Sequence, residues 1–166
     1  MKRKSKLTAL HFPRPRTATV LLALGLSLAL SLHAAAPNAD EAAKAKVIAA
    51  ATGGKFKATH GQYFDLACNA MLDYDAEVID LNGDGQPEVF TGVQGSCLGG
   101  AAGVHMNLYI KGRNGRWTPQ FGFPGVYTAL TTKNKGYPDI EIGGPGNCFP
   151  VWRWNGRQYA PYKKCN

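Results

Sequence analysis

The spacing of hydrophobic positions changes near residue 55, and the change predicts one helix followed by strands. Between residues 37 and 55, apolar residues recur at helical spacing at Val47, Ile48 and Ala51, and Gly53-Gly54 is a stop signal. We therefore expect a short N-terminal helix over about residues 39–52. From residue 56 to residue 166 the apolar residues fall in short alternating runs, which are typical of strands.

Five of these runs have the length and composition of β-strands: residues 78–79, 88–91, 107–110, 139–142 and 151–154. Asn-Gly and Lys-Gly pairs lie between them and favour tight turns. The pattern predicts a mainly β fold (α+β with one short N-terminal helix) that is built from antiparallel hairpins.

An internal repeat organises the β-rich region. Residues 87–92 match residues 138–143 at an offset of 51, and the Gly-x-Cys at 95–97 matches that at 146–148 at the same offset. The Asn-Gly segments that begin at Asn114 and Asn155 also resemble each other. We expect two degenerate copies of about 50 residues, over about 76–119 and 127–161. The first copy carries about ten extra residues near 98–104.

The sharpest chemical signal lies just before the run at 88–91. Oxygen-bearing side chains occur at alternating positions, Asp80, Asn82 and Asp84, and are followed by Gly85. A hard cation such as Ca²⁺ binds six to eight oxygens at about 2.3–2.6 Å, and alternating side chains can converge when the chain curls around the ion. Glycine permits the sharp turn.

Two further residues complete the predicted calcium site. Gln86 would offer its backbone carbonyl, and Glu88 would close the shell directly or through water. The stretch is not an EF-hand, because Thr91 stands where the acid at position 12 is expected and the exit from the loop is a strand.

The loop resembles the short calcium loops of FG-GAP and VCBS-type β repeats, in which an Asp-x-Asp/Asn-Gly-Asp-Gly stretch lies between two strands. The hairpin at residues 152–159 is similar to the Trp/Tyr-x-Asn/Asp-Gly-x-x-Tyr hairpins of small exported proteins with such loops. The resemblance implies calcium-binding hairpins, and in the FG-GAP family the repeats build propellers for adhesion or receptor binding. Two copies cannot close a propeller of four or more blades.

The second copy limits the chain to one predicted calcium site with a structural role. The positions equivalent to the three oxygen-bearing side chains hold two cations, which repel a divalent ion. These positions are Thr131, Lys133 and Lys135.

The first 36 residues have the pattern of a cleaved secretory signal peptide. They contain six cations and no acid, an apolar run at 20–32, and small residues at 34–36. A helix of that run spans about 20 Å, short of the roughly 30 Å bilayer core. We expect a periplasmic or secreted protein with no membrane span after cleavage. Its net charge falls from +8 to +2, so no nucleic-acid partner is indicated.

Four cysteines in an exported chain fit two disulfides. Cys68 and Cys97 bracket the 80–88 loop almost symmetrically, and Cys148 and Cys165 flank the 154–159 hairpin, which slightly favours these two pairs. If the two copies pack as neighbours, a Cys97–Cys148 bond with Cys68–Cys165 is the rival.

Aromatic residues offer a possible ligand platform at Trp117, Trp152 and Trp154. Trp152 and Trp154 share one strand face and Arg153 takes the other. Core packing competes with an exposed platform for sugars or a peptide.

Signals for catalysis are weak. Residues 37–166 contain one serine, Ser96, and no spacing typical of a nucleophile elbow or a zinc site. We expect a non-catalytic binding or envelope-associated module for an unknown protein or glycan ligand. The alternatives are a small secreted hydrolase on cell-wall or polysaccharide substrate, using acids between Asp73 and Glu77, and an exported enzyme inhibitor that presents the loop at 98–103.

Overall fold

The computed structural model describes residues 39–146 and 148–164. The predicted signal peptide (1–36) and Cys165 lie outside the described residues. In these residues no helix combines the length and the apolar character that crossing a membrane requires. The elements in chain order are α1 (Ala39–Ala51), β1 (His60–Asp65), β2 (Ala70–Ile79), β3 (Glu88–Gln94), α2 (Ser96–Gly99), η1 (Gly100–Ala102), β4 (Val104–Lys111), β5 (Trp117–Pro124), β6 (Val126–Asn134), β7 (Tyr137–Gly143), β8 (Val151–Trp154) and β9 (Tyr159–Lys163).

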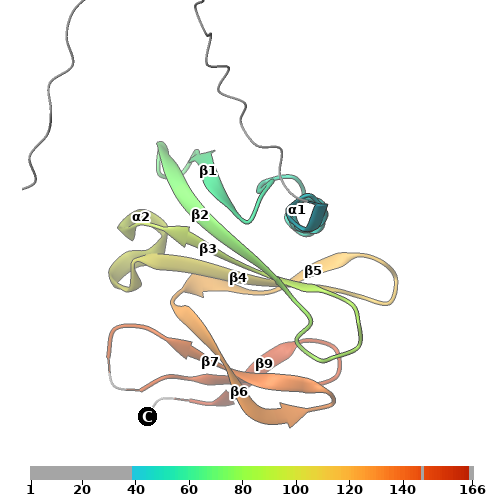
Figure 1. The fold of residues 1–166 in the computed structure, drawn as a ribbon. Helices are drawn as coiled ribbons and strands as arrows, with labels where there is room; N and C mark the ends of the chain where they lie inside the picture. Colours follow the sequence, from blue (N-terminus) through green and yellow to red (C-terminus); the bar gives the residue numbers. More distant parts are fainter. Residues whose placement is uncertain (1–38, 147, 165–166) are drawn as a thin grey trace, which may run out of the picture. The chain divides into compact units, whose positions relative to one another are not determined.

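The nine strands form two antiparallel sheets (Figure 1). The first sheet has the order β1-β2-β3-β4-β5 and the second the order β6-β7-β8-β9, so each is a meander of hairpins. The predicted mainly β class with a short N-terminal helix is confirmed, and each of the five predicted runs lies within a strand. β1, β5, β6 and most of β2 were not predicted, and β9 was predicted only as the second arm of the 154–159 hairpin.

Helix α1 begins and ends as local chemistry dictates. Asp40 and Glu41 lie in its first turn, where carboxylates favour the positive end of the helix, and the Lys44 ammonium lies 2.7 Å from an Asp40 carboxylate oxygen. Gly53 follows the helix with a φ of +63°, a left-handed conformation that glycine adopts without strain. Ile48 is fully buried and fixes the helix to the first sheet.

Two apolar layers hold the fold together. One lies between α1 and the first sheet, and it is formed by Ile48, Ala51, Phe56, Tyr74, Ala76, Val89 and Val93. The other lies between the two sheets, and it is formed by Leu81, Phe90, Met106, Leu108, Ile110, Phe121, Ile140, Ile142 and Tyr159.

The residues that match in the sequence occupy equivalent places in two four-stranded meanders, β2–β5 and β6–β9. β3 and β7 are the second strand of each, and the extra residues of the first copy form α2 and η1. Val89 of β3 faces α1, whereas its equivalent Ile140 of β7 faces the first sheet. The meanders therefore stack head to tail, and α1 covers the face that a preceding copy would otherwise cover.

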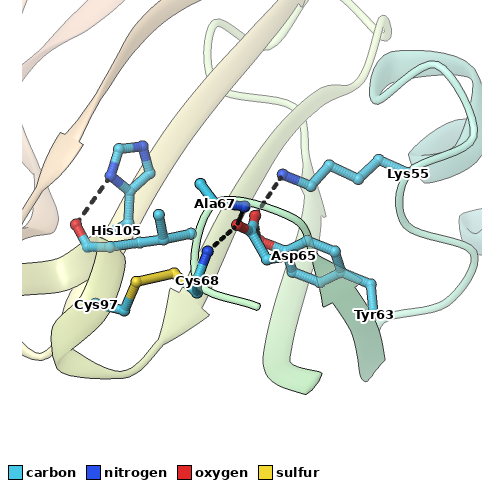
Figure 2. The surroundings of a disulfide bond; sticks show 8 residues. Lys55, Tyr63, Asp65, Ala67, Cys68, Cys97 and His105 are labelled. Carbon is cyan, nitrogen blue, oxygen red and sulfur yellow. Dashed lines mark hydrogen bonds and ion pairs between the residues drawn. A yellow bond between two sulfur atoms is a disulfide. The ribbon is translucent and has the colours of Figure 1, made fainter. Parts of the chain in front are cut away.

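The disulfide between Cys68 and Cys97 links the β1–β2 turn to α2, with the two Cα atoms 6.0 Å apart (Figure 2). Asp65 shapes that turn by accepting hydrogen bonds from the backbone N–H groups of Ala67 and Cys68. The bond confirms the favoured pair and shows that the rival Cys97–Cys148 pair is wrong, because the sulfur of Cys97 is bonded to Cys68. Cys148 is also disulfide-bonded.

Candidate functional site

The loop between β2 and β3 is organised by the carboxylate of Asp80. Its Oδ1 accepts hydrogen bonds from the N–H groups of Gly83 at 2.8 Å and Asp84 at 3.1 Å, and its Oδ2 accepts one from Gly85 at 2.9 Å. Gly85 has a φ of +80°, which explains the glycine at this position. The backbone N–H of Gly85 contributes most to lowering the pKa of Asp80 below its ordinary value.

Asn82 and Asp84 turn toward each other inside the loop. The Asn82 Nδ2 donates to Asp84 Oδ2 at 2.9 Å, and the Asn82 Oδ1 accepts from the Asp84 N–H at 2.8 Å. The Gln86 N–H donates to Asp84 Oδ1 at 2.8 Å. The loop is thus folded around its own side-chain oxygens.

Glu88, the first residue of β3, is buried beneath the loop and is only 2% exposed. Its carboxylate accepts hydrogen bonds from the N–H of Leu81 at 2.8 Å and the hydroxyl of Tyr137 at 2.9 Å. Burial is the main cause that raises the pKa of Glu88 above its ordinary value, and the nearby charges of Asp84 and Asp80 add to the shift.

Asp139 is the equivalent buried acid of the second copy, and its surroundings are different. Arg153 donates to both of its carboxylate oxygens, from Nε at 2.8 Å and from Nη2 at 2.7 Å, and Thr132 donates at 2.7 Å. The Arg153 contact is the main cause that lowers the pKa of Asp139. The described residues provide no such ion pair for Glu88.

The donor set of the loop fits a hard cation. Asp80 Oδ2, Asn82 Oδ1 and Asp84 Oδ1 each accept one hydrogen bond, so each oxygen retains a lone pair. Carboxylate, amide and carbonyl oxygens are the ligands that Ca²⁺ takes. In the described part of the chain, no three His, Cys, Asp or Glu side chains lie together as a metal-binding group. The predicted set instead mixes acids with the amide of Asn82 and the carbonyl of Gln86.

A groove of about 1220 Å³ adjoins this loop. Asn82 and Asp84 line it on one side, and Trp152, Trp154 and Tyr137 line it from the second sheet. Four cationic side chains also line the groove: Lys111, Arg113, Lys135 and Arg157. The calcium-loop candidate and an aromatic surface therefore lie side by side.

The three tryptophans predicted as a platform do not lie together. Trp152 and Trp154 share one face of β8, as expected, with Arg153 on the other. They line the groove and also pack on the core, since the ring centroids of Trp152 and Phe121 are 5.7 Å apart and those of Trp154 and Tyr137 are 4.5 Å apart. Trp117 instead packs against the layer beneath α1.

Comparison with known protein families, curated proteins and solved structures gave no match. The assignment of a function to this chain therefore rests on its own residues and their geometry.

The acids considered for hydrolysis lie on one strand face. Asp75 and Glu77 of β2 line a hollow of about 420 Å³, but they are two residues apart on the same strand and so lie side by side. A glycosidase requires two carboxyl groups that face each other across the scissile bond. This arrangement does not favour the hydrolase alternative.

The segment at 98–103 is compact. It belongs to α2 and η1, is tied to the first sheet through Cys97, and places the carbonyl of Leu98 3.3 Å from His105 Nδ1 (Figure 2). Gly99 in it is buried, and a side chain there would clash, because a Cβ would lie 2.3 Å from the backbone N of Val104.

Sequence reasoning missed the partners that come from the second sheet. Tyr137 reaches Glu88 across the layer between the sheets, and Tyr127 donates a hydrogen bond to Glu77. No sequence signal identifies either contact, because the residues are 49 and 50 positions apart. The match of Glu88 with Asp139 at an offset of 51 was a usable signal that the two acids occupy equivalent places in the two copies.

Proposed function

We propose that this chain is an exported, disulfide-stabilised β module that binds one calcium ion and has a non-catalytic binding role. The observation that carries the proposal is the difference in charge compensation between two equivalent buried acids. Asp139 has Arg153 as its cation, whereas no cationic side chain of the described residues forms an ion pair with Glu88, which lies beneath Asp80 and Asp84. A divalent cation in the loop would provide the missing positive charge.

The residues that would hold the ion are Asp80, Asn82, Asp84, the carbonyl of Gln86, and Glu88. Bound calcium would supply positive charge to a set of oxygens and so would have a structural role. The protein's own contribution is to hold those oxygens in place with the backbone N–H groups of Gly83 and Gly85. The β2–β3 connection would then hold one wall of the groove in a fixed position.

The binding role is supported by the groove beside the loop. Its half-buried tryptophan rings and exposed polar side chains provide both apolar faces and hydrogen-bonding groups, which suit a glycan or a peptide. Export is supported by the pattern of residues 1–36 and by the Cys68–Cys97 bond, since disulfides persist in oxidising compartments.

Calcium titration into the metal-stripped protein tests the proposal. We expect one binding event with a dissociation constant of about 10⁻⁴–10⁻³ M, as in extracellular modules. At ten times that concentration the gain in unfolding free energy is about 1.4 kcal/mol, which corresponds to a rise in melting temperature of about 5 °C. Calorimetry and melting curves in calcium and in chelator measure both quantities.

The double variant Asp80→Ala/Asp84→Ala should lose the heat and the temperature shift. The control is Thr131→Ala/Lys133→Ala, which alters the positions of the second copy that are equivalent to Asp80 and Asn82 and should retain both. Absence of binding in the wild-type protein would contradict the proposal. A shift that persists in the Asp80/Asp84 variant would place the ion elsewhere.

A further inference from the structure

The hollow beside Asp75 and Glu77 lies where the chain crosses from β5 to β6, away from the calcium loop and the groove. The rings of Phe90 and Tyr127 are stacked with centroids 3.5 Å apart, and both residues line the hollow. Apolar side chains form most of its lining: Phe90, Val104, Met106, Val126 and Tyr127. Its volume of about 420 Å³ lies in the range of small-molecule sites, roughly 300–1,000 Å³.

The edge of the hollow is negatively charged. Asp75 and Glu77 are exposed and project from the same face of β2. Their hydrogen-bond donors are neutral, the amide of Gln94 for Asp75 and the hydroxyl of Tyr127 for Glu77. Throughout residues 39–146 and 148–164, no Lys, Arg or His forms an ion pair with either carboxylate.

We propose that this hollow binds an organic cation with an aliphatic body, which is the chemistry of an alkylammonium group. The apolar lining would remove the aliphatic chain from water, and the two carboxylates would accept hydrogen bonds from the ammonium group. An anion would be repelled by the same carboxylates, and a bare metal ion would gain nothing from the apolar wall. The ammonium group comes either from a free small amine or from a lysine side chain of a protein partner.

Titration with n-hexylammonium chloride, followed by amide chemical shifts in NMR, tests this inference on the purified protein. We expect saturable shifts at residues that line the hollow, such as Gly92 and Val104. The uncharged analogue n-hexanol should bind about five- to tenfold more weakly, since each exposed charge pair contributes modestly. Hexanoate should not bind.

Three variants define the site. Asp75→Asn/Glu77→Gln should weaken n-hexylammonium binding about five- to tenfold and abolish the preference over n-hexanol. Asp73→Asn is the matched control, because Asp73 lies on the same strand face but does not line the hollow; it should bind like the wild-type protein. Val126→Phe enlarges an exposed side chain at the edge and should block binding of both ligands.

Nα-acetyl-lysine methylamide distinguishes the two sources. Binding as tight as that of n-hexylammonium points to a lysine side chain of a partner, and much weaker binding points to a free amine. Equal affinity for n-hexanol and n-hexylammonium, shifts only at other residues, or no saturable shift would overturn the inference. The result is independent of the calcium proposal, because the hollow shares no residue with the loop.

Discussion

Replacing Asp139 by Asn is expected to lower the free energy of unfolding by about 3 kcal/mol. Asp139 is 1% exposed and receives three hydrogen bonds, two of them from Arg153. The variant leaves the Arg153 guanidinium without its counter-charge. It also places the NH2 group of the new asparagine opposite one of the groups that donate to the carboxylate in the wild-type protein. Because the Arg153 side chain is 30% exposed, water compensates in part, and the loss falls at the lower end of values for buried pairs. Urea unfolding measures it.

The loss should depend on pH with a defined sign. The pKa of folded Asp139 is lowered from its ordinary value of 3.8, chiefly by Arg153. The stabilisation by the ionised carboxylate is therefore fully present above pH 3.8 and is lost as the pH falls through the folded-state pKa. The difference between wild type and Asp139→Asn should be constant from pH 7 to about pH 5 and should shrink below pH 3.8.

Glu88→Gln, the equivalent substitution in the first copy, provides the matched control in chelator. Within the part of the chain that the structure describes, Glu88 forms no ion pair, and a glutamine can accept from the Leu81 N–H and donate to the Tyr137 oxygen. We expect no comparable loss of stability. Similar losses in the two variants would show that Arg153 does not account for the cost at Asp139.

Removing the Cys68–Cys97 bond with Cys68→Ala/Cys97→Ala is expected to lower the free energy of unfolding by about 3–4 kcal/mol, because the cross-link closes a 29-residue segment of the unfolded chain. Urea unfolding in chelator gives the value. Hydrogen exchange should accelerate at the β1–β2 turn and at α2, the two segments that the bond joins.

Ser96→Ala, at an exposed neighbour of Cys97 on α2, serves as the control and should leave stability unchanged. A loss below about 1 kcal/mol in the cysteine variant would mean that the unfolded chain is already constrained in this region.

Strong local signals predicted elements well. The change from helical to alternating spacing predicted the end of α1 to within one residue. The Asn-Gly signal predicted the hairpin in which Trp154 pairs with Tyr159. Other strands could not be predicted, because apolar and polar residues do not alternate clearly along them. No residue of β6 is buried, and its sequence VYTALTTKN ends in a run of four polar residues. Its pairing with β7 is what makes it a strand.

The candidate loop could be predicted because its chemistry is local. Asp80, Asn82, Asp84 and Gly85 lie within six positions, and the hydrogen bonds that organise them join residues at most five apart. The burial of Glu88 could not be predicted, because it depends on Tyr137 from the second sheet. The same reason separates Trp117 from Trp152 and Trp154, which belong to strands of different sheets.

The sequence by itself determined the mainly β class, the N-terminal helix, the two-copy organisation and the oxygen-rich loop, because each of these depends on the spacing of neighbouring residues. Only the tertiary structure decided that the copies stack head to tail, so that α1 covers one face of the first copy and the second copy covers the other. That stacking buries Glu88 between the sheets, whereas its equivalent Asp139 pairs with Arg153. The two acids have the same place in the repeat and opposite pKa shifts, because burial and charge partners are set by contacts between segments far apart in the chain.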